Sequence, residues 1–210
     1  MDIIYLMDSS GSIGHDDYEK QKDFVKDLAR VFRIGPGASR AAVVTYDDFP
    51  IVRANFDDFD STDSFAEAVE SINQTRGRTR IDRALVKTSE MFKSARKNVP
   101  KVLIALTDGA QTPDPGSLPL DEASQLLRDQ GVKVYALGVG HQVNVTQLRS
   151  MVESNSDVFL VDSFVDLLRK SQSIAEKACS EIGSGKLYLS TFQLVWKVVR
   201  FAFLLFYYAL

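Results

Sequence analysis

The sequence predicts an α/β fold, a doubly wound and mostly parallel sheet of six strands with helices on both faces. Short continuous apolar runs such as DIIYLM and VLIALT recur along the chain and end in acids and glycines. Amphipathic segments with helical spacing separate these runs. A chain of 210 residues with 45% hydrophobic and 25% charged residues suits one globular domain. Buried strands that alternate with helices are typical of a parallel sheet covered on both sides.

The first half of the chain is expected to contain three strands and three helices. In order, these are a strand at 2–8, a helix at 16–33, strands at 40–48 and 51–56, and helices at 63–73 and 81–97. Asp16 and Asp17 favour the start of the first helix, because acids near a helix N-terminus interact well with its dipole. The turn at 47–50 joins two consecutive strands and predicts one short antiparallel edge strand.

The second half repeats the alternation of strand and helix. It is expected to contain strands at 102–109, 132–140 and 157–162, with helices near 120–130, 144–153 and 163–182. Residues 1–182 would then form one domain. Residues 183–186, GSGK, are expected to be a linker, followed by an apolar tail over 187–210.

The tail has three interpretations. It is long enough to span a bilayer, but Lys197 and Arg200 lie near its middle and make insertion close to neutral in free energy. It is therefore a membrane or interfacial segment, a translated non-coding tail on a truncated gene model, or an additional packed helix.

Charge and cysteine content limit the class of protein. A net charge of −3 argues against a general nucleic-acid binder, which usually has a basic surplus. The single cysteine, Cys179, cannot form a disulfide within this chain. No signal peptide precedes the first expected strand, which begins almost at Met1, and we therefore expect the chain to be a fragment.

Oxygen-bearing side chains follow two of the buried strands. Asp8, Ser10 and Ser12 end the first strand at alternate positions, and Asp108 ends the strand VLIALT. Ligands of doubly wound sheets bind at the carboxyl ends of the strands, where strand order reverses. Thr79 lies between a glycine turn and an expected helix and supplies a third hydroxyl. Two carboxylates and three hydroxyls suit a hard cation, Mg²⁺ or Mn²⁺ before Zn²⁺.

The pattern Asp8-Ser9-Ser10-Gly11-Ser12, then Thr79, then Thr107-Asp108-Gly109, resembles the von Willebrand factor type A domain and its metal-ion-dependent adhesion site. The resemblance covers about residues 2–182. It implies that the three hydroxyls contact the metal and that the two acids hold it mainly through water. An acidic side chain of a partner would complete the coordination. Ile81 departs from the family pattern, which commonly has a small or hydroxyl residue there.

The resemblance favours the collagen and matrilin branch of that family. It therefore implies an extracellular, secreted protein whose partner belongs to the matrix or a cell surface. In that branch a cysteine before the first strand often pairs with one at the end of the last helix. Cys179 matches the second position, so the resemblance implies a disulfide to a cysteine absent from this chain.

Several residues near these motifs have a functional and a plain interpretation. Arg76, Arg78 and Arg80 flank Thr79 and, with Gly109, are candidates for a rim that attracts an acidic ligand; otherwise the arginines belong to a solvated loop. Thr79 is alternatively an N-cap of the helix that follows it. Asn73 and Asn144 begin N-glycosylation triplets, which matter only in a secreted chain.

Three classes of function are compatible with a domain of this kind. A metal-dependent adhesion module fits the motifs best, and an intracellular assembly scaffold of the same fold is the alternative. An enzyme would need a general base or nucleophile beside the metal. The sequence contains no HExxH, no P-loop and no GxSxG motif, so we expect no enzymatic activity.

Overall fold

The computed structural model describes residues 1–182, with side chains as far as Ala178. The strands are β1 (Asp2–Asp8), β2 (Arg40–Tyr46), β3 (Pro50–Ala54), β4 (Lys101–Thr107), β5 (Val132–Val139) and β6 (Val158–Val161). The helices are α1 (His15–Phe32), α2 (Thr62–Glu70), α3 (Ile81–Phe92), α4 (Leu120–Arg128), α5 (Val145–Met151), the short 3₁₀ helix η1 (Asn155–Asp157) and α6 (Phe164–Ile182). The predicted α/β class and all six strands are confirmed.

The six strands form one sheet in the order β3-β2-β1-β4-β5-β6. All neighbours are parallel except β3, which pairs antiparallel with β2 and forms the predicted edge strand. The chain adds β2 on one side of β1 and later returns to add β4 on the other side. The strand order therefore reverses between β1 and β4, and in sheets of this kind a ligand site lies at that position.

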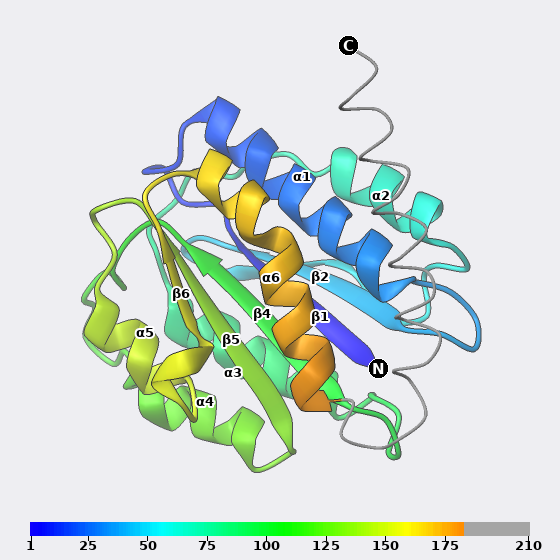
Figure 1. Cartoon of the computed structure of the whole chain (residues 1–210). Coiled ribbons are helices and arrows are strands. Elements are labelled where there is room, and N and C mark those ends of the chain that lie inside the picture. Colours follow the sequence, from blue (N-terminus) through cyan, green and yellow to red (C-terminus); the bar gives the residue numbers. More distant parts are fainter. Residues whose placement is uncertain (183–210) are drawn as a thin grey trace. The chain divides into compact units, whose positions relative to one another are not determined.

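Helices cover both faces of the sheet (Figure 1). Helix α1 packs beside α2 on one face, while α3, α4 and α5 pack in sequence on the other. The first compact unit of the chain is Met1–Gln172, and a second begins at Ser173 within α6. The domain boundary predicted at residue 182 stays a prediction, and the tail at 187–210 lies outside the described residues. Among the residues that are described, no helix is long and apolar enough to cross a membrane.

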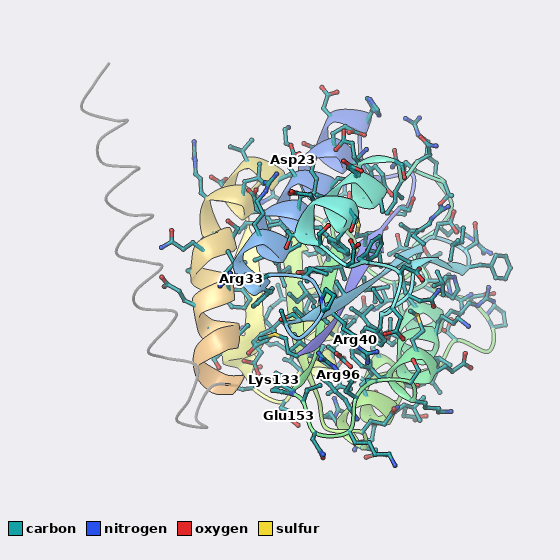
Figure 2. All side chains as sticks on the ribbon, turned by 90° about the vertical axis from the view of Figure 1, so that its right-hand side faces the viewer. Asp23, Arg33, Arg40, Arg96, Lys133 and Glu153 are labelled. Atoms are coloured by element: carbon teal, nitrogen blue, oxygen red, sulfur yellow. The ribbon has the colours of Figure 1, made fainter. Side chains whose placement is uncertain are left out.

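The predicted extension of α3 to residue 97 is wrong, and buried Asp2 explains why. Helix α3 ends at Phe92, and three tight turns follow it. The backbone N–H of Arg96 then donates to Asp2 Oδ2 at 2.7 Å, so it is not available for a helical bond. The guanidinium groups of Arg40 and Arg96 also contact this carboxylate, and both arginines are labelled in Figure 2. The contacts with Asp2 therefore keep the chain from continuing as a helix at Arg96.

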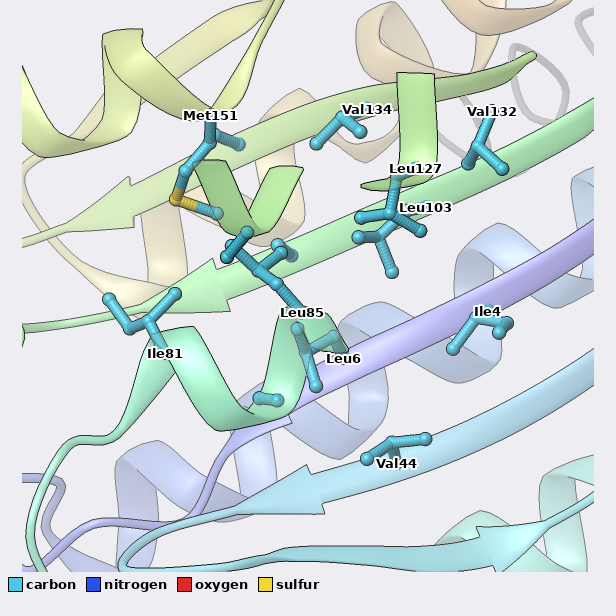
Figure 3. Close-up of a cluster of buried hydrophobic side chains, with 14 of the residues drawn as sticks. Ile4, Leu6, Val44, Ile81, Leu85, Leu103, Leu127, Val132, Val134 and Met151 are labelled. Atoms are coloured by element: carbon cyan, nitrogen blue, oxygen red, sulfur yellow. The ribbon is translucent and has the colours of Figure 1, made fainter. Parts of the chain in front are cut away.

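The core is apolar on both faces of the central strands. Ile4 and Leu6 of β1 face one side, and Ile3 and Tyr5 face the other, because side chains alternate along a strand. The cluster drawn in Figure 3 joins residues of β1, β2, β4 and β5 to residues of α3, α4 and α5. This explains why the strands read as continuous apolar runs and not as alternating ones.

We predict that Leu103→Ala lowers the free energy of unfolding by about 2–5 kcal/mol, since it removes a fully buried side chain from this cluster and leaves a cavity. Leu126→Ala is the matched control, because Leu126 is 41% exposed on α4, and we expect a change of about 0.5 kcal/mol or less. Urea denaturation of the full chain measures both values. Equal losses in the two variants would contradict this description of the core.

Candidate metal centre

The end of β1 places a carboxylate in the interior. Asp8 is fully buried and lies opposite Tyr46 in the parallel register of β1 and β2. The Thr107 hydroxyl of β4 donates to Asp8 Oδ2 at 2.7 Å, and the Tyr46 hydroxyl lies 3.3 Å from the same oxygen. The backbone N–H of Ser10 donates to Oδ1 at 2.9 Å. Both neighbouring strands thus fix the orientation of this carboxylate.

A chain of short contacts connects Asp8 to Asp108 across the switch point. Ser10 Oγ lies 3.0 Å from Ser12 Oγ, and the Ser12 hydroxyl donates to Asp108 Oδ1 at 2.8 Å. Ser10 is buried, whereas Ser12 is exposed, so the contacts run from the interior to the surface. The structure therefore brings together four of the five residues that the sequence placed at this site.

Thr79 approaches the same place from the loop before α3. A Cβ built on Gly109 would lie 4.0 Å from Thr79 Oγ1, so this hydroxyl is adjacent to the residue that follows Asp108. The backbone of Thr79 is held by Thr112, whose N–H donates to the Thr79 carbonyl at 2.8 Å and whose hydroxyl accepts from the Thr79 N–H at 3.3 Å. We call Asp8, Ser10, Ser12, Thr79 and Asp108 the oxygen cluster. Their roles as metal ligands stay a prediction.

The electrostatics of the oxygen cluster favour a cation. Burial raises the pKa of Asp8 to about 6 and also raises the pKa of Asp108, because a charged carboxylate loses its hydration there. Neither carboxylate forms an ion pair with a lysine, arginine or histidine among residues 1–182. The described residues contain no group of three or more His, Cys, Asp or Glu side chains suited to a metal. A cation at this position would therefore depend on the hydroxyls as well as on the two acids, and hard cations accept oxygen ligands of this kind.

Sequence reasoning missed the residues that hold the oxygen cluster in place. Tyr46 and Thr107 bond Asp8, and the Gln21 side chain of α1 donates to the Asp8 carbonyl at 2.8 Å. Gln74 donates to the carbonyls of Ser10 and Ile13, at 2.9 and 2.8 Å. The strand predicted at 40–48 gave no register, and only the observed parallel pairing of β1 with β2 places Tyr46 beside Asp8.

Two interpretations of the loop at 76–80 are wrong. Thr79 is not the N-cap of α3, because the cap position belongs to Arg80, which makes no side-chain cap bond. Arg80 is not a rim residue either. Its side chain is 2% exposed and forms ion pairs with Asp82, at 2.9 Å, and with Asp114. Burying a guanidinium requires such carboxylates, and Asp82 is only two residues away.

The other residues predicted to have a role at the surface are Arg78, Asn73 and Asn144, and all three are exposed. Arg78 pairs with Asp48 at 2.5 Å. Asn144 caps α5 by accepting from the Gln147 N–H at 3.2 Å. Glycosylation of Asn73 and Asn144 stays a prediction. Cys179 lies on α6, beyond the described side chains, so its disulfide also stays a prediction.

Comparison with known proteins identifies relatives of this chain. A family model for the von Willebrand factor type A domain matches residues 2–173. Cuticlin-6 of Caenorhabditis elegans is 38% identical over 170 residues, which are 80% of this chain and 29% of that protein. The collagen alpha-4(VI) chain of Mus musculus is 36% identical over 180 residues, 85% of this chain and 7% of that one. The chain therefore spans less than a third of either relative.

A solved structure carries the same fold together with a metal. It is proximal thread matrix protein 1 from the mussel byssus, with zinc in its metal-ion-dependent adhesion site (MIDAS) motif. It superposes on this chain with a TM-score of 0.78 at 30% sequence identity. The match covers 85% of this chain and 45% of that one. BatB from Bacteroides thetaiotaomicron, at 19% identity and a TM-score of 0.65, shares the fold.

We predict that Asp8→Asn stabilises the protein in EDTA at pH 7. The pKa of Asp8 is raised from 3.8 to about 6, so the folded protein holds this proton more tightly than the unfolded chain. The stabilisation from Asp8 is therefore complete below about pH 4 and is lost as the pH rises through 6, by at most about 3 kcal/mol. Tyr46 and Thr107 have second acceptors in the carbonyls of Leu106 and Gly109, so their hydroxyls can accept from the new amide.

Urea denaturation at pH 4 and pH 7 measures this effect. We expect Asp8→Asn to gain about 1–3 kcal/mol over the wild type at pH 7 and little at pH 4. Asp162→Asn at an exposed acid serves as the control. A variant less stable than wild type at pH 7 would contradict the buried, charged state of Asp8.

We predict that Arg80→Ala lowers the free energy of unfolding by about 3–5 kcal/mol, because it leaves buried Asp82 without its cation. Arg78→Ala removes a 56% exposed guanidinium from the same loop and should cost about 0.5 kcal/mol or less. Thermal and urea unfolding compare the two variants. A small loss for Arg80→Ala would mean that the buried ion pairs are dispensable.

Proposed function

The chain belongs to the von Willebrand factor type A family, and from this premise we propose that its oxygen cluster holds Mg²⁺ or Mn²⁺ and binds an acidic side chain of a partner protein. The observation that carries the proposal is the pair of carboxylates, Asp8 and Asp108, with raised pKa values and no cationic side chain bonded to either among residues 1–182. A divalent cation would offset the cost of keeping both charged.

The donors fit a hard cation. Ser10, Ser12 and Thr79 offer neutral hydroxyls, and Asp8 and Asp108 act mainly through water. Neutral oxygens leave a divalent cation incompletely neutralised, so when bound it supplies an open position for an external carboxylate. The zinc in the mussel protein belongs to that protein; the oxygen donors here favour Mg²⁺ or Mn²⁺.

The class of partner follows from the relatives. Cuticlin and collagen relatives support a role in the extracellular matrix, and adhesion is the general function that the family supports. We propose that the partner is a matrix or cell-surface protein and that residues 1–182 form the binding domain. A binding role is preferred over catalysis, because within the described chain the oxygen cluster contacts no histidine, lysine or cysteine that would serve as a base or nucleophile.

We predict that calorimetric titration of the full chain with Mg²⁺ and with Mn²⁺ shows one saturable site. Ser10→Ala should weaken this binding about tenfold or more, because it removes a hydroxyl donor at the centre of the cluster. The range must extend to millimolar metal, since sites that await an external ligand bind their metal weakly.

Asp162→Asn is the control and should leave the titration unchanged. Saturable binding in the wild type that Ser10→Ala weakens about tenfold or more would support the site. If the folded wild type binds neither metal, the proposed function is wrong.

A further inference from the structure

Arg76 adopts a backbone conformation that its residue type disfavours. Its φ is 65°, in the left-handed region, where only Arg76 and Arg33 stand among the non-glycine residues of the described chain. Glycine adopts this conformation without steric cost, and Gly77 is the next residue. Arg76 therefore adopts a disfavoured backbone conformation, and residues in such conformations cluster at functional sites.

The backbone around Arg76 lies directly against the loop that carries Ser10. The Arg76 N–H donates to the Ser9 carbonyl at 2.8 Å, and the Gly11 N–H donates to the Gly77 carbonyl at 2.9 Å. A Cβ on Gly11 would come within 3.3 Å of the Arg76 carbonyl oxygen. The two loop segments therefore pack tightly against each other at Gly11. These contacts hold Arg76 at the side of the oxygen cluster.

The other arginines of this segment have partners for their charge. Arg78 pairs with Asp48, and Arg80 is buried between two carboxylates. The Arg83 guanidinium lies 5.0 Å from the Phe49 ring centroid and donates to the Asp48 carbonyl at 2.9 Å. The Arg76 side chain is exposed, and within residues 1–182 it forms no hydrogen bond or ion pair. Its charge is available to an external group.

Acidic side chains also lie near the oxygen cluster. Asp17, in the first turn of α1, pairs with Lys20 at 2.8 Å, and its charge acts on Asp108. Asp47 lies beside Arg76, because its carboxylate accepts from the Gly77 N–H at 3.2 Å. Among these acids the Arg76 guanidinium is a group that attracts a negative side chain of a partner.

We propose that Arg76 is a specificity-determining contact that selects acidic partner segments carrying a second carboxylate beside the one that binds the metal. The inference rests on the proposed function and extends it from a single acidic side chain to a segment with two. The second carboxylate would pair with the Arg76 guanidinium, an interaction that is directional and charge-assisted. Its contribution is to specificity and to the rate of association.

The test uses the full chain and arrayed synthetic peptides in a glycine and serine background. Each peptide carries one central glutamate, alone or with a second glutamate at one nearby position, and binding is measured in Mg²⁺ and in EDTA. We expect the wild type to bind the best peptide with two acids about three- to tenfold more tightly than the peptide with one, and high salt to reduce this ratio.

Three variants separate recognition from backbone effects. Arg76→Gly relieves the left-handed backbone and removes the charge, so it should fold at least as well as wild type and lose the preference. Arg76→Lys should keep part of it. Arg33→Gly is the matched control, because it makes the same backbone and charge change at the C-cap of α1. Arg33 is labelled in Figure 2, and its variant should keep the preference.

The outcomes distinguish this inference from the function on which it rests. Binding that depends on Mg²⁺ but shows no preference for a second acid in the wild type overturns the role of Arg76 and leaves the proposed function intact. A preference that survives in Arg76→Gly overturns it as well. Absence of any Mg²⁺-dependent binding across the array counts against both proposals.

Discussion

The buried carboxylate of Asp8 is the constraint on which the site depends. It stands at the carboxyl end of the central strand, and hydroxyls from both neighbouring strands contact it. Its own backbone carbonyl accepts from Gln21 of α1. The two strands, the first helix and the loop at 9–12 thus meet at one charged group. Removing that group from water raises its pKa, so a charged Asp8 lowers the stability of the fold unless a cation or another group offsets the cost of its burial.

β1 carries a buried aspartate at each end, and the two aspartates differ in whether arginines pair with them. At the start of the strand, Asp2 is fully buried and its carboxylate contacts Arg40 and Arg96, and these hydrogen bonds hold its pKa below the usual value despite burial. At the other end, Asp8 receives only hydroxyl and backbone donors. One acid is neutralised by the protein and serves the structure. The other has no cationic side chain bonded to it among the described residues, and a perturbed carboxylate of this kind is a candidate functional group.

The sequence was sufficient to predict the strands and the residues that gather in the oxygen cluster, whose roles as ligands stay a prediction. It was insufficient to predict the residues that hold the cluster in place. Continuous apolar runs identify strands that are buried on both faces, and the alternate spacing of Asp8, Ser10 and Ser12 reflects an extended backbone. The end of α3 was not predictable, because a carboxylate 94 positions away binds Arg96. Burial of Arg80 was likewise invisible, since it depends on Asp114 from the loop before α4. Long-range ion pairs override local patterns in both places.

The loop at 74–80 shows how contacts that hold the oxygen cluster in place also position a side chain that can contact a partner. Gln74 binds the carbonyls of the Ser10 loop, Thr79 is fixed by Thr112, and Arg80 is anchored in the interior. The segment between these anchors cannot relax freely, so the left-handed conformation of Arg76 is imposed by its surroundings and not chosen by its sequence. The rigid loop holds the backbone of Arg76 in a defined position before any partner arrives. That pre-organisation reduces the entropy lost on binding, and it is the physical reason why one exposed arginine beside the oxygen cluster can discriminate between partners.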